Sequence, residues 1–222
     1  MQKELMITED GSHTIYLPEM DEHYHSTHGA IQESLHIYIE QGLLQLSLKE
    51  ISILEIGFGT GLNAYLTFCY AKKNGLKVNY YSVEKYPLQV DEYSKLNYTK
   101  TIFPELSSVF DQMHRANWEA NIEISPDFML HKINADLVNY SFETIDPVHL
   151  VFFDAFAPSK QPEMWSDEIL ERVAKVVWKD GILVTYCAKG SVRRAFSAAG
   201  FEMERIPGPI GKKEILRGKK KF

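Results

Sequence analysis

Residues 51–63 read ISILEIGFGTGLN, and this stretch decides the fold. Isoleucine and leucine dominate its first four positions, as is typical of a buried strand, and the residues after it have the composition of a helix. Between strand and helix, Gly57, Gly59 and Gly61 allow backbone conformations that other residues avoid and let a ligand approach the main chain. A strand, a glycine turn and a helix N-terminus in this order predict the first βα unit of a doubly wound α/β sheet.

Two kinds of cofactor fit this turn. Residues 59–64 (GTGLNA) match G-x-G-x-x-G/A, the dinucleotide fingerprint, so the turn alone leaves an NAD enzyme open. The longer run 55–61 (EIGFGTG) resembles the first motif of class I S-adenosylmethionine (SAM) methyltransferases. A carboxylate at Glu55 suits the ammonium of SAM, directly or through water, and would repel a pyrophosphate. We therefore expect SAM rather than NAD or an empty turn, with contacts from Glu55, Gly57, Phe58, Gly59, Gly61 and Asn63.

Length and composition indicate a globular protein with one main domain. The chain has 222 residues, of which 45% are hydrophobic and 24% charged, as is ordinary for such proteins. It shows no apolar run long enough to span a membrane and no signal peptide, so a cytoplasmic location is expected. Cys69 and Cys187 fall in a predicted helix and a predicted strand, and they suggest neither a disulfide nor a metal site.

The charge is distributed unevenly along the chain. The net charge is −6, but residues 172–222 contain thirteen Lys and Arg against four Asp and Glu. A basic surface on an otherwise acidic protein favours contacts with phosphates, as in nucleic-acid binding, and a solvated surface without a partner is the alternative.

The N-terminal residues are predicted to form an extension. Residues 3–17 read as two strands around the hairpin signal Asp10-Gly11, and Ser26 or Thr27 is the expected N-cap of a following helix. We expect residues 1–46 to form this hairpin and a lid helix, packed on a catalytic domain of residues 47–222.

This lid is expected to cross the mouth of the cofactor site. Tyr24 and Glu33 are its candidate cofactor contacts. His23, His25 and His28 invite a metal interpretation, but their spacing matches no zinc pattern and no cysteine joins them, so no metal is expected.

Acidic residues follow two further strands of the predicted sheet. Strand Lys77–Glu84 ends 23 residues beyond Gly61, where a carboxylate can accept both ribose hydroxyls of a nucleoside. Asp136 follows the strand at 128–133. In SAM enzymes an acidic group there commonly meets the adenine amino group, and a helix N-cap is the alternative. Glu84 and Asp136 are therefore candidate cofactor contacts.

Asp154 is the candidate catalytic residue. It follows Val148–Phe153 (VHLVFF), an apolar run suited to a strand covered on both faces, and so lies where open α/β sheets bind ligands. An amine must lose a proton before it is methylated, and a carboxylate can orient the amine and accept that proton. Phe156 and Pro158 are expected to wall the acceptor. The alternative role for Asp154 is a helix N-cap, although a turn containing Pro158 follows it.

The remaining elements complete a predicted α/β, Rossmann-like, seven-stranded class I SAM-dependent methyltransferase fold with a small N-terminal hairpin-plus-helix extension. Helices are expected at 87–98, 103–118, 163–177 and 191–199, and further strands at 121–124, 181–187, 201–206 and 213–216.

Four stretches resemble the tRNA 5-methylaminomethyl-2-thiouridine methyltransferase family, which includes the MnmC methyltransferase domain and free-standing MnmD proteins. They are residues 24–34 (YHSTHGAIQES), 55–63 (EIGFGTGLN), 154–165 (DAFAPSKQPEMW) and 198–218 (AAGFEMERIPGPIGKKEILRG). The sequence departs from the family at Ala155, where relatives often have glycine, and in PGPIGKKE, where a shorter glycine-rich turn is common.

The resemblance implies an N-methyltransferase that uses SAM to convert 5-aminomethyl-(2-thio)uridine at the tRNA wobble position to 5-methylaminomethyl-(2-thio)uridine. It implies that Asp154 lies near the acceptor amine and that Lys160, Lys212 and Lys213 contact tRNA phosphates. The base would have to be flipped out of the anticodon loop. The flavin oxidoreductase domain of two-domain relatives is not expected.

Three other functions remain open at this point. An N-methyltransferase of a small amine would need no basic surface. An NAD(P) oxidoreductase would use the same glycine turn, and a tRNA-binding subunit without activity would keep the fold but not the chemistry.

Overall fold

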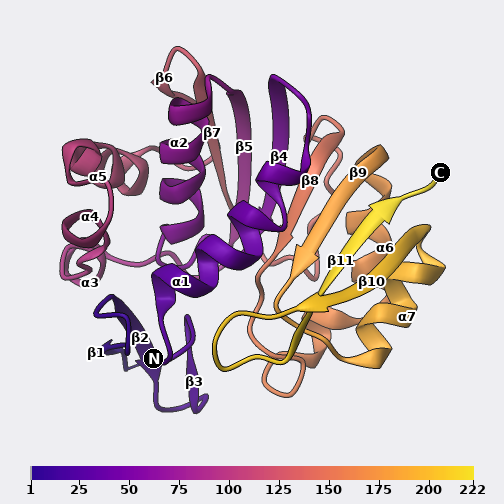
Figure 1. Cartoon of the computed structure of the whole chain (residues 1–222), viewed down its shortest axis with the longest axis horizontal. Coiled ribbons are helices and arrows are strands. Elements are labelled where there is room, and N and C mark those ends of the chain that lie inside the picture. The colour runs from indigo at the N-terminus through magenta and orange to yellow at the C-terminus, as the bar shows by residue number, and fades with distance from the viewer. Residues whose placement is uncertain (1) are drawn as a thin grey trace.

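The computed structural model describes residues 2–222 as a large sheet covered by helices on both faces, with a small sheet beside it (Figure 1). The strands of the large sheet are β4 (Glu50–Ile56), β5 (Lys77–Glu84), β6 (Asn121–Ser125), β7 (Phe128–Asn134), β8 (Val148–Phe153), β9 (Val177–Thr185), β10 (Phe201–Pro207) and β11 (Glu214–Lys220). Their order is β10-β11-β9-β8-β4-β5-β7-β6. The five central strands are parallel, and antiparallel pairs form the two edges.

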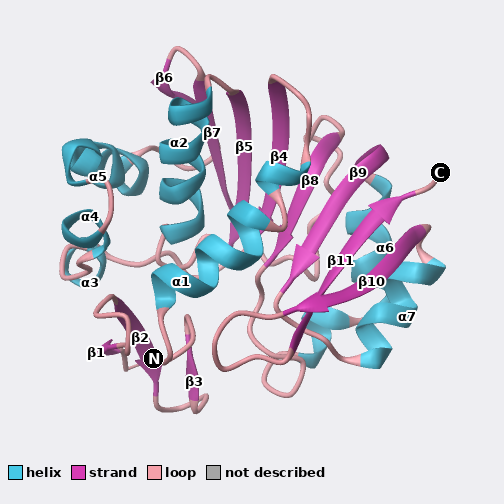
Figure 2. Ribbon diagram, in the orientation of Figure 1, coloured by secondary structure: helices cyan, strands magenta, loops and turns pink. Residues whose placement is uncertain are grey.

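Alternating residues of the strands explain the layers seen in Figure 2. The helices are α1 (Ala30–Ser34), α2 (Leu62–Asn74), α3 (Val90–Tyr93), α4 (Tyr98–Thr101), α5 (Ser107–Arg115), α6 (Asp167–Lys175) and α7 (Gly190–Ala198). Ile51 and Ile53 of β4 pack into a core with α1, α2 and α5, whereas Leu54 and Ile56 pack into a second core with α6 and α7. Because successive strand residues point to opposite faces, a strand that is apolar throughout belongs in the middle of three layers.

The predicted α/β, Rossmann-like architecture is confirmed, with one addition to the strand count. The sheet has eight strands rather than seven, because the strand expected at 121–124 also joins it, as β6, antiparallel to β7 at that edge. The helix predicted at 87–98 is instead the two short helices α3 and α4. The helix predicted at 163–177 begins only at Asp167, where the hydroxyl of Ser166 accepts the N–H of Ile169 at 3.4 Å.

The predicted N-terminal hairpin is present, but its helix is capped differently. Strands β1 (Glu4–Ile7), β2 (His13–Leu17) and β3 (Glu22–His23) form the small sheet. The expected N-cap at Ser26 or Thr27 is wrong, because α1 begins after Gly29. Ser12 Oγ accepts the N–H of Ala30 at 3.1 Å, and Asp10 accepts that of Gln32 at 3.0 Å, so the hairpin supplies the cap. The boundary at residue 46 stays a prediction.

The first helix continues beyond α1 as a π-helical segment, Leu35–Glu40. Gly42 follows this segment and lies very close to it, since a Cβ there would be 2.5 Å from the carbonyl oxygen of Tyr38. Within residues 2–222, none of the helices is both long and apolar enough to cross a membrane.

Candidate active site

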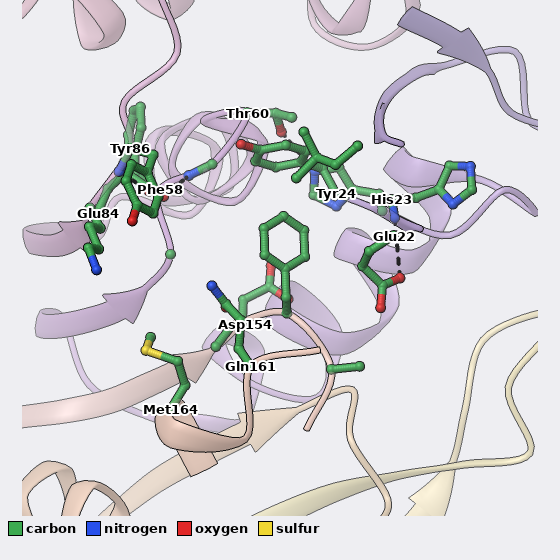
Figure 3. A pocket seen from close by; sticks show the side chains of 18 of the residues that line it. Glu22, His23, Tyr24, Phe58, Thr60, Glu84, Tyr86, Asp154, Gln161 and Met164 are labelled. Atoms are coloured by element: carbon green, nitrogen blue, oxygen red, sulfur yellow. Dashed lines mark hydrogen bonds between the residues drawn. The ribbon is translucent and has the colours of Figure 1, made fainter. Parts of the chain in front are cut away.

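A cavity of about 760 Å³ opens at the carboxyl ends of β4, β5 and β8. Open α/β sheets bind ligands at this edge, and the volume suits a small-molecule cofactor. In Figure 3, Glu84 and Phe58 lie on one side of the cavity, and Asp154 faces Tyr24 across it. The expected site residues that line it are Tyr24, Glu33, Gly57, Phe58, Gly59, Asn63, Glu84, Asp136, Asp154, Phe156 and Lys212.

The glycine turn forms one wall of the cavity. Gly57, Gly59 and Gly61 have φ angles of 93°, 49° and 73°, which favour glycine. A Cβ on Gly57 would lie 2.9 Å from the carbonyl oxygen of Asp154, and one on Gly61 would lie 2.8 Å from Nε2 of His114. The turn thus needs glycine at these positions and exposes its main chain at Gly57 and Gly59, as the expected SAM would require. Gly61 begins α2 and does not line the cavity.

Glu84 and Asp136 bring two carboxylates to the cavity from the ends of β5 and β7. Glu84 Oε2 accepts the N–H of Gly59 at 3.0 Å, which ties the acid to the glycine turn. Asp136 forms a 2.8 Å ion pair with Lys85, and this hydrogen bond lowers the pKa of Asp136 below its usual value. Carboxylate oxygens accept hydrogen bonds, so both side chains suit the hydroxyl and amino groups of a nucleoside.

Asp154 lies at the end of β8 with both carboxylate oxygens held by the protein. The hydroxyl of Tyr38 donates to Oδ1 at 2.5 Å, and Nδ2 of Asn63 donates to Oδ2 at 2.9 Å. The pKa of Asp154 is raised to about 7, chiefly by burial and also by the charge of Glu33, and the two hydrogen bonds oppose this rise. A carboxylate with a pKa near neutrality can accept a proton and release it again.

The loop after Asp154 is held by two aromatic side chains. Trp165 donates its indole N–H to the carbonyl oxygen of Phe156 at 2.8 Å, and the Tyr186 hydroxyl donates to that of Ala155 at 2.9 Å. The ring of Phe156 meets that of Tyr24 edge-on at 5.1 Å between centroids. An aromatic wall thus stands beside the acid, where it can exclude water from an amine.

Glu33 and Lys212 form a charged pair inside the cavity. Lys212 Nζ lies 3.4 Å from Glu33 Oε1, and the N–H of Ser26 donates to the other oxygen of Glu33 at 2.7 Å. The ammonium of Lys212 also lies 4.8 Å from the centroid of the Tyr186 ring. Lys212 therefore belongs to the cavity rather than to the outer surface on which a phosphate contact was expected.

Glu55 departs most clearly from expectation. Its side chain is fully buried and does not line the cavity, so the expected direct contact with a cofactor ammonium is ruled out by geometry. Ser82 donates to Oε2 at 2.6 Å, while Oε1 has no partner within residues 2–222. Burial raises the pKa of the Glu55 carboxyl well above its usual value, and the hydrogen bond from Ser82 opposes this rise.

Three expected substrate contacts lie outside the cavity, and Tyr38 is an unexpected neighbour of Asp154. Pro158, Lys160 and Lys213 do not line the cavity, and Lys160 lies 3.6 Å from Asp21 of the N-terminal segment. Tyr38 was not among the residues expected at the site, because nothing in the sequence pattern distinguishes it from other residues of the predicted helix. Its π-helical backbone, which often occurs near functional sites, is visible only in the structure.

The three N-terminal histidines do not come together. The buried His25 lines the cavity and shares a 2.7 Å hydrogen bond with Thr60, and burial lowers the pKa of its imidazole to about 4. His28 instead lies 3.0 Å from Glu9. Across the described residues, no three His, Cys, Asp or Glu side chains are grouped to hold a metal ion.

Comparison with known proteins agrees with this geometry. A profile of the family described as S-adenosyl-L-methionine-dependent methyltransferases matches residues 92–221. The tRNA 5-methylaminomethyl-2-thiouridine biosynthesis bifunctional protein MnmC of Pseudomonas entomophila is 31% identical over an alignment of 220 residues that covers 90% of this chain and 32% of that protein. The protein of the same name from Leptospira interrogans is 31% identical over an alignment of 229 residues that covers 96% of this chain and 35% of that protein. The chain thus spans about a third of these relatives' length.

Solved structures show the same relationship. MnmC2 from Aquifex aeolicus superposes with a TM-score of 0.81 and 26% identity, covering 98% of this chain and 69% of that one. Spermidine synthase from Thermotoga maritima shares the fold alone, with a TM-score of 0.59 and 12% identity over 99% of this chain and 72% of its own. The family profile removes the NAD alternative. The glycine turn allows close approach of a ligand, and acids lie at three strand ends beside it. The family profile matches more than half of the sequence. The chain therefore belongs to the S-adenosyl-L-methionine-dependent methyltransferases.

Proposed function

We propose that this chain transfers a methyl group from SAM to the primary amine of 5-aminomethyl-(2-thio)uridine at the tRNA wobble position. The product would be 5-methylaminomethyl-(2-thio)uridine. The observation that carries this proposal is Asp154, an acid with a pKa near 7 that faces the cavity beside Gly57. The names of the MnmC relatives supply the substrate class.

In the proposed reaction, Asp154 performs the proton transfer. SAM, when bound, supplies a methyl group activated by a sulfonium. Asp154 binds the incoming ammonium and accepts its proton, which frees the nitrogen lone pair for in-line attack. Tyr38 and Asn63 hold the carboxylate, and Phe156 with Tyr24 excludes water around the amine. The ionised carboxylate of Asp154 favours a cationic acceptor over a neutral one, because Lys212 already balances the charge of Glu33.

We propose that the cofactor lies along the glycine turn. Gly57 and Gly59 would contact it through the main chain, Glu84 would accept the ribose hydroxyls, and Asp136 would accept the adenine amino group. The other proposed contacts are Phe58, Asn63, Tyr24 and Glu33, which line the cavity. We propose no direct cofactor contact for the Glu55 carboxyl, because it is sealed inside the core.

The tRNA would approach from the side of the β10–β11 loop. Lys213 is exposed there and forms no ion pair within residues 2–222, so it is available for a phosphate. Exposed Lys189, Arg193 and Arg194 at the start of α7 likewise have no carboxylate partner within that range. We propose that these cations, with Lys160 and Pro158 on the opposite loop, guide the anticodon loop of a cytoplasmic tRNA so that the wobble base enters the cavity.

Incubation with SAM and tRNA from a strain that lacks the modification tests this proposal. Nucleoside mass spectrometry should show a gain of one methyl group on aminomethyluridine, with no change in tRNA that carries the carboxymethylated form. Methylation of a free small amine that is insensitive to salt, without methylation of tRNA, would instead favour a small-molecule methyltransferase. Absence of any methyl transfer, with tRNA binding retained, would indicate a binding subunit.

A further inference from the structure

Asp154 is supported from behind by a tyrosine that does not touch the cavity. The Tyr38 side chain is 1% exposed, and its hydroxyl donates to Asp154 Oδ1 at 2.5 Å. Asp154 is its one hydrogen-bond partner among residues 2–222. A buried hydroxyl costs free energy unless it is hydrogen-bonded, and packing alone needs only the aromatic ring. The hydroxyl of Tyr38 therefore serves the carboxylate.

The backbone fixes the position of Tyr38 closely. Tyr38 belongs to the π-helical segment Leu35–Glu40, and its ring packs on Phe152 with centroids 5.1 Å apart. The close approach of Gly42 to the Tyr38 carbonyl holds the end of the segment. In a regular α-helix, residues five apart point about 140° away from each other, and the wider π turn reduces this angle. Glu33 and Tyr38 consequently both face Asp154 from one helix.

We propose that Tyr38 is a positioning residue for methyl transfer, whose hydroxyl fixes Oδ1 of Asp154 so that the free lone pairs of the carboxylate face the acceptor amine. This inference rests on the proposed role of Asp154 as the group that accepts the amine proton. Tyr38 itself neither touches the substrate nor accepts that proton.

The hydrogen bond also favours the ionised form of Asp154. The bond from Tyr38 lowers the pKa of Asp154, against burial, which raises it to about 7 overall. Other groups from several elements also influence the pKa of Asp154. A change at Tyr38 leaves these groups in place. They are Glu33 of α1, Glu55 of β4, Asn63 of α2, Tyr186 after β9 and Lys212 before β11. Loss of the Tyr38 hydroxyl should therefore raise the pKa of Asp154.

The test compares Tyr38→Phe with Tyr65→Phe as a matched control. Tyr65 is equally buried, but its hydroxyl donates to the carbonyl oxygen of Phe103 at 2.8 Å, away from Asp154. The carboxyl of Asp154 is followed by ¹³C NMR in aspartate-labelled full-length protein, and its signal is identified by its loss in Asp154→Asn. We expect the titration midpoint to rise by about one pH unit or more in Tyr38→Phe and to stay unchanged in Tyr65→Phe.

A second variant keeps the inference testable if Tyr38→Phe does not fold. Replacement of Tyr38 alone by 3-fluorotyrosine retains the ring and provides a more acidic hydroxyl, so the midpoint should fall below that of the natural protein. A midpoint that is unchanged in every Tyr38 variant that folds overturns the inference.

The titration is independent of tRNA, so it separates this inference from the proposed function. In methyl-transfer assays, the rise of kcat/KM with pH should move to higher pH in Tyr38→Phe, while the Kd for SAM stays within about twofold. An upward shift of the NMR midpoint without methylation of tRNA would refute the proposed substrate and retain the role of Tyr38. Methylation of tRNA that depends on Asp154 but shows no shift of the midpoint would refute the role of Tyr38 alone.

Discussion

The ammonium of Lys212 lies 3.4 Å from the carboxylate of Glu33 and joins the β10–β11 loop to the N-terminal helix across the cavity. Glu33 also receives the N–H of Ser26, so one buried carboxylate links the lid segment, the helix and a loop near the end of the chain. Because of this arrangement, Lys212 and Lys213 lie in different environments although they are adjacent in the sequence. The first of these adjacent lysines faces the acids of the site, and the second faces solvent.

Lys212→Met should change the pH dependence of methyl transfer. Methionine keeps the length of the side chain but removes the charge that lowers the pKa of Asp154, so Asp154 should ionise only at higher pH. We expect kcat/KM for tRNA to fall severalfold at pH 7 and to recover on the alkaline side. A pH profile that matches the natural protein would mean that Lys212 does not act on Asp154.

Lys213→Glu should affect tRNA binding and leave the chemistry intact. An exposed lysine that contacts a phosphate contributes to counterion release, so its reversal should raise the KM for tRNA and reduce the slope of log K against log salt by about 1. The pH profile should not move, which makes this variant the neighbouring control for Lys212→Met. If the KM and the salt dependence both stay the same, the phosphate-binding surface lies elsewhere.

Asp154→Asn should abolish most of the activity without loss of cofactor binding. The amide has the same size but cannot accept the amine proton, and general-base catalysis typically contributes about 100-fold or more. We expect kcat to fall by at least about 100-fold, while calorimetry gives an unchanged Kd for SAM. Turnover near the natural rate would refute the assignment of Asp154 as the base.

The same substitution should increase stability at alkaline pH. The pKa of Asp154 is about 7 in the folded protein against an ordinary value of 3.8, so the folded state binds the proton more tightly than the unfolded state. Stability therefore falls as pH rises between these values, and the cost of the buried charge is complete above about pH 7. Asp154→Asn should melt higher than the natural protein at pH 8, and this advantage should shrink at pH 5. A difference in Tm that is independent of pH would contradict the raised pKa.

The sequence predicted those features that depend on local pattern. The apolar run of β8 placed Asp154 at a strand end, and the spacing from Gly61 to Glu84 placed a second acid at the same edge. Both follow from the rule that parallel strands end together, which requires no knowledge of side-chain packing.

Other features depend on partners that are distant in sequence. The cap of α1 comes from Ser12 and Asp10 of the hairpin, so a search for a local cap selected the wrong residues. Tyr38 is separated by 116 positions from Asp154, and nothing in a helical pattern distinguishes a tyrosine that packs from one that supports a carboxylate. Glu55 matches the acidic position of the motif, but its burial depends on how the neighbouring strands pack around it, which the motif does not show.

Glu55→Gln and Glu84→Gln form a matched pair that tests which acid serves the cofactor. Glu55 is fully buried, does not line the cavity, and has a pKa that burial raises, so glutamine should leave the Kd for SAM within about threefold. Glu84 lines the cavity and accepts the N–H of Gly59, so the loss of its charge should weaken SAM binding by about 10-fold or more. Titration calorimetry at pH 7 measures both. If Glu55→Gln weakens SAM as strongly as Glu84→Gln, Glu55 must ionise when the cofactor binds, and its charge would then reach the ammonium of SAM through the intervening residues.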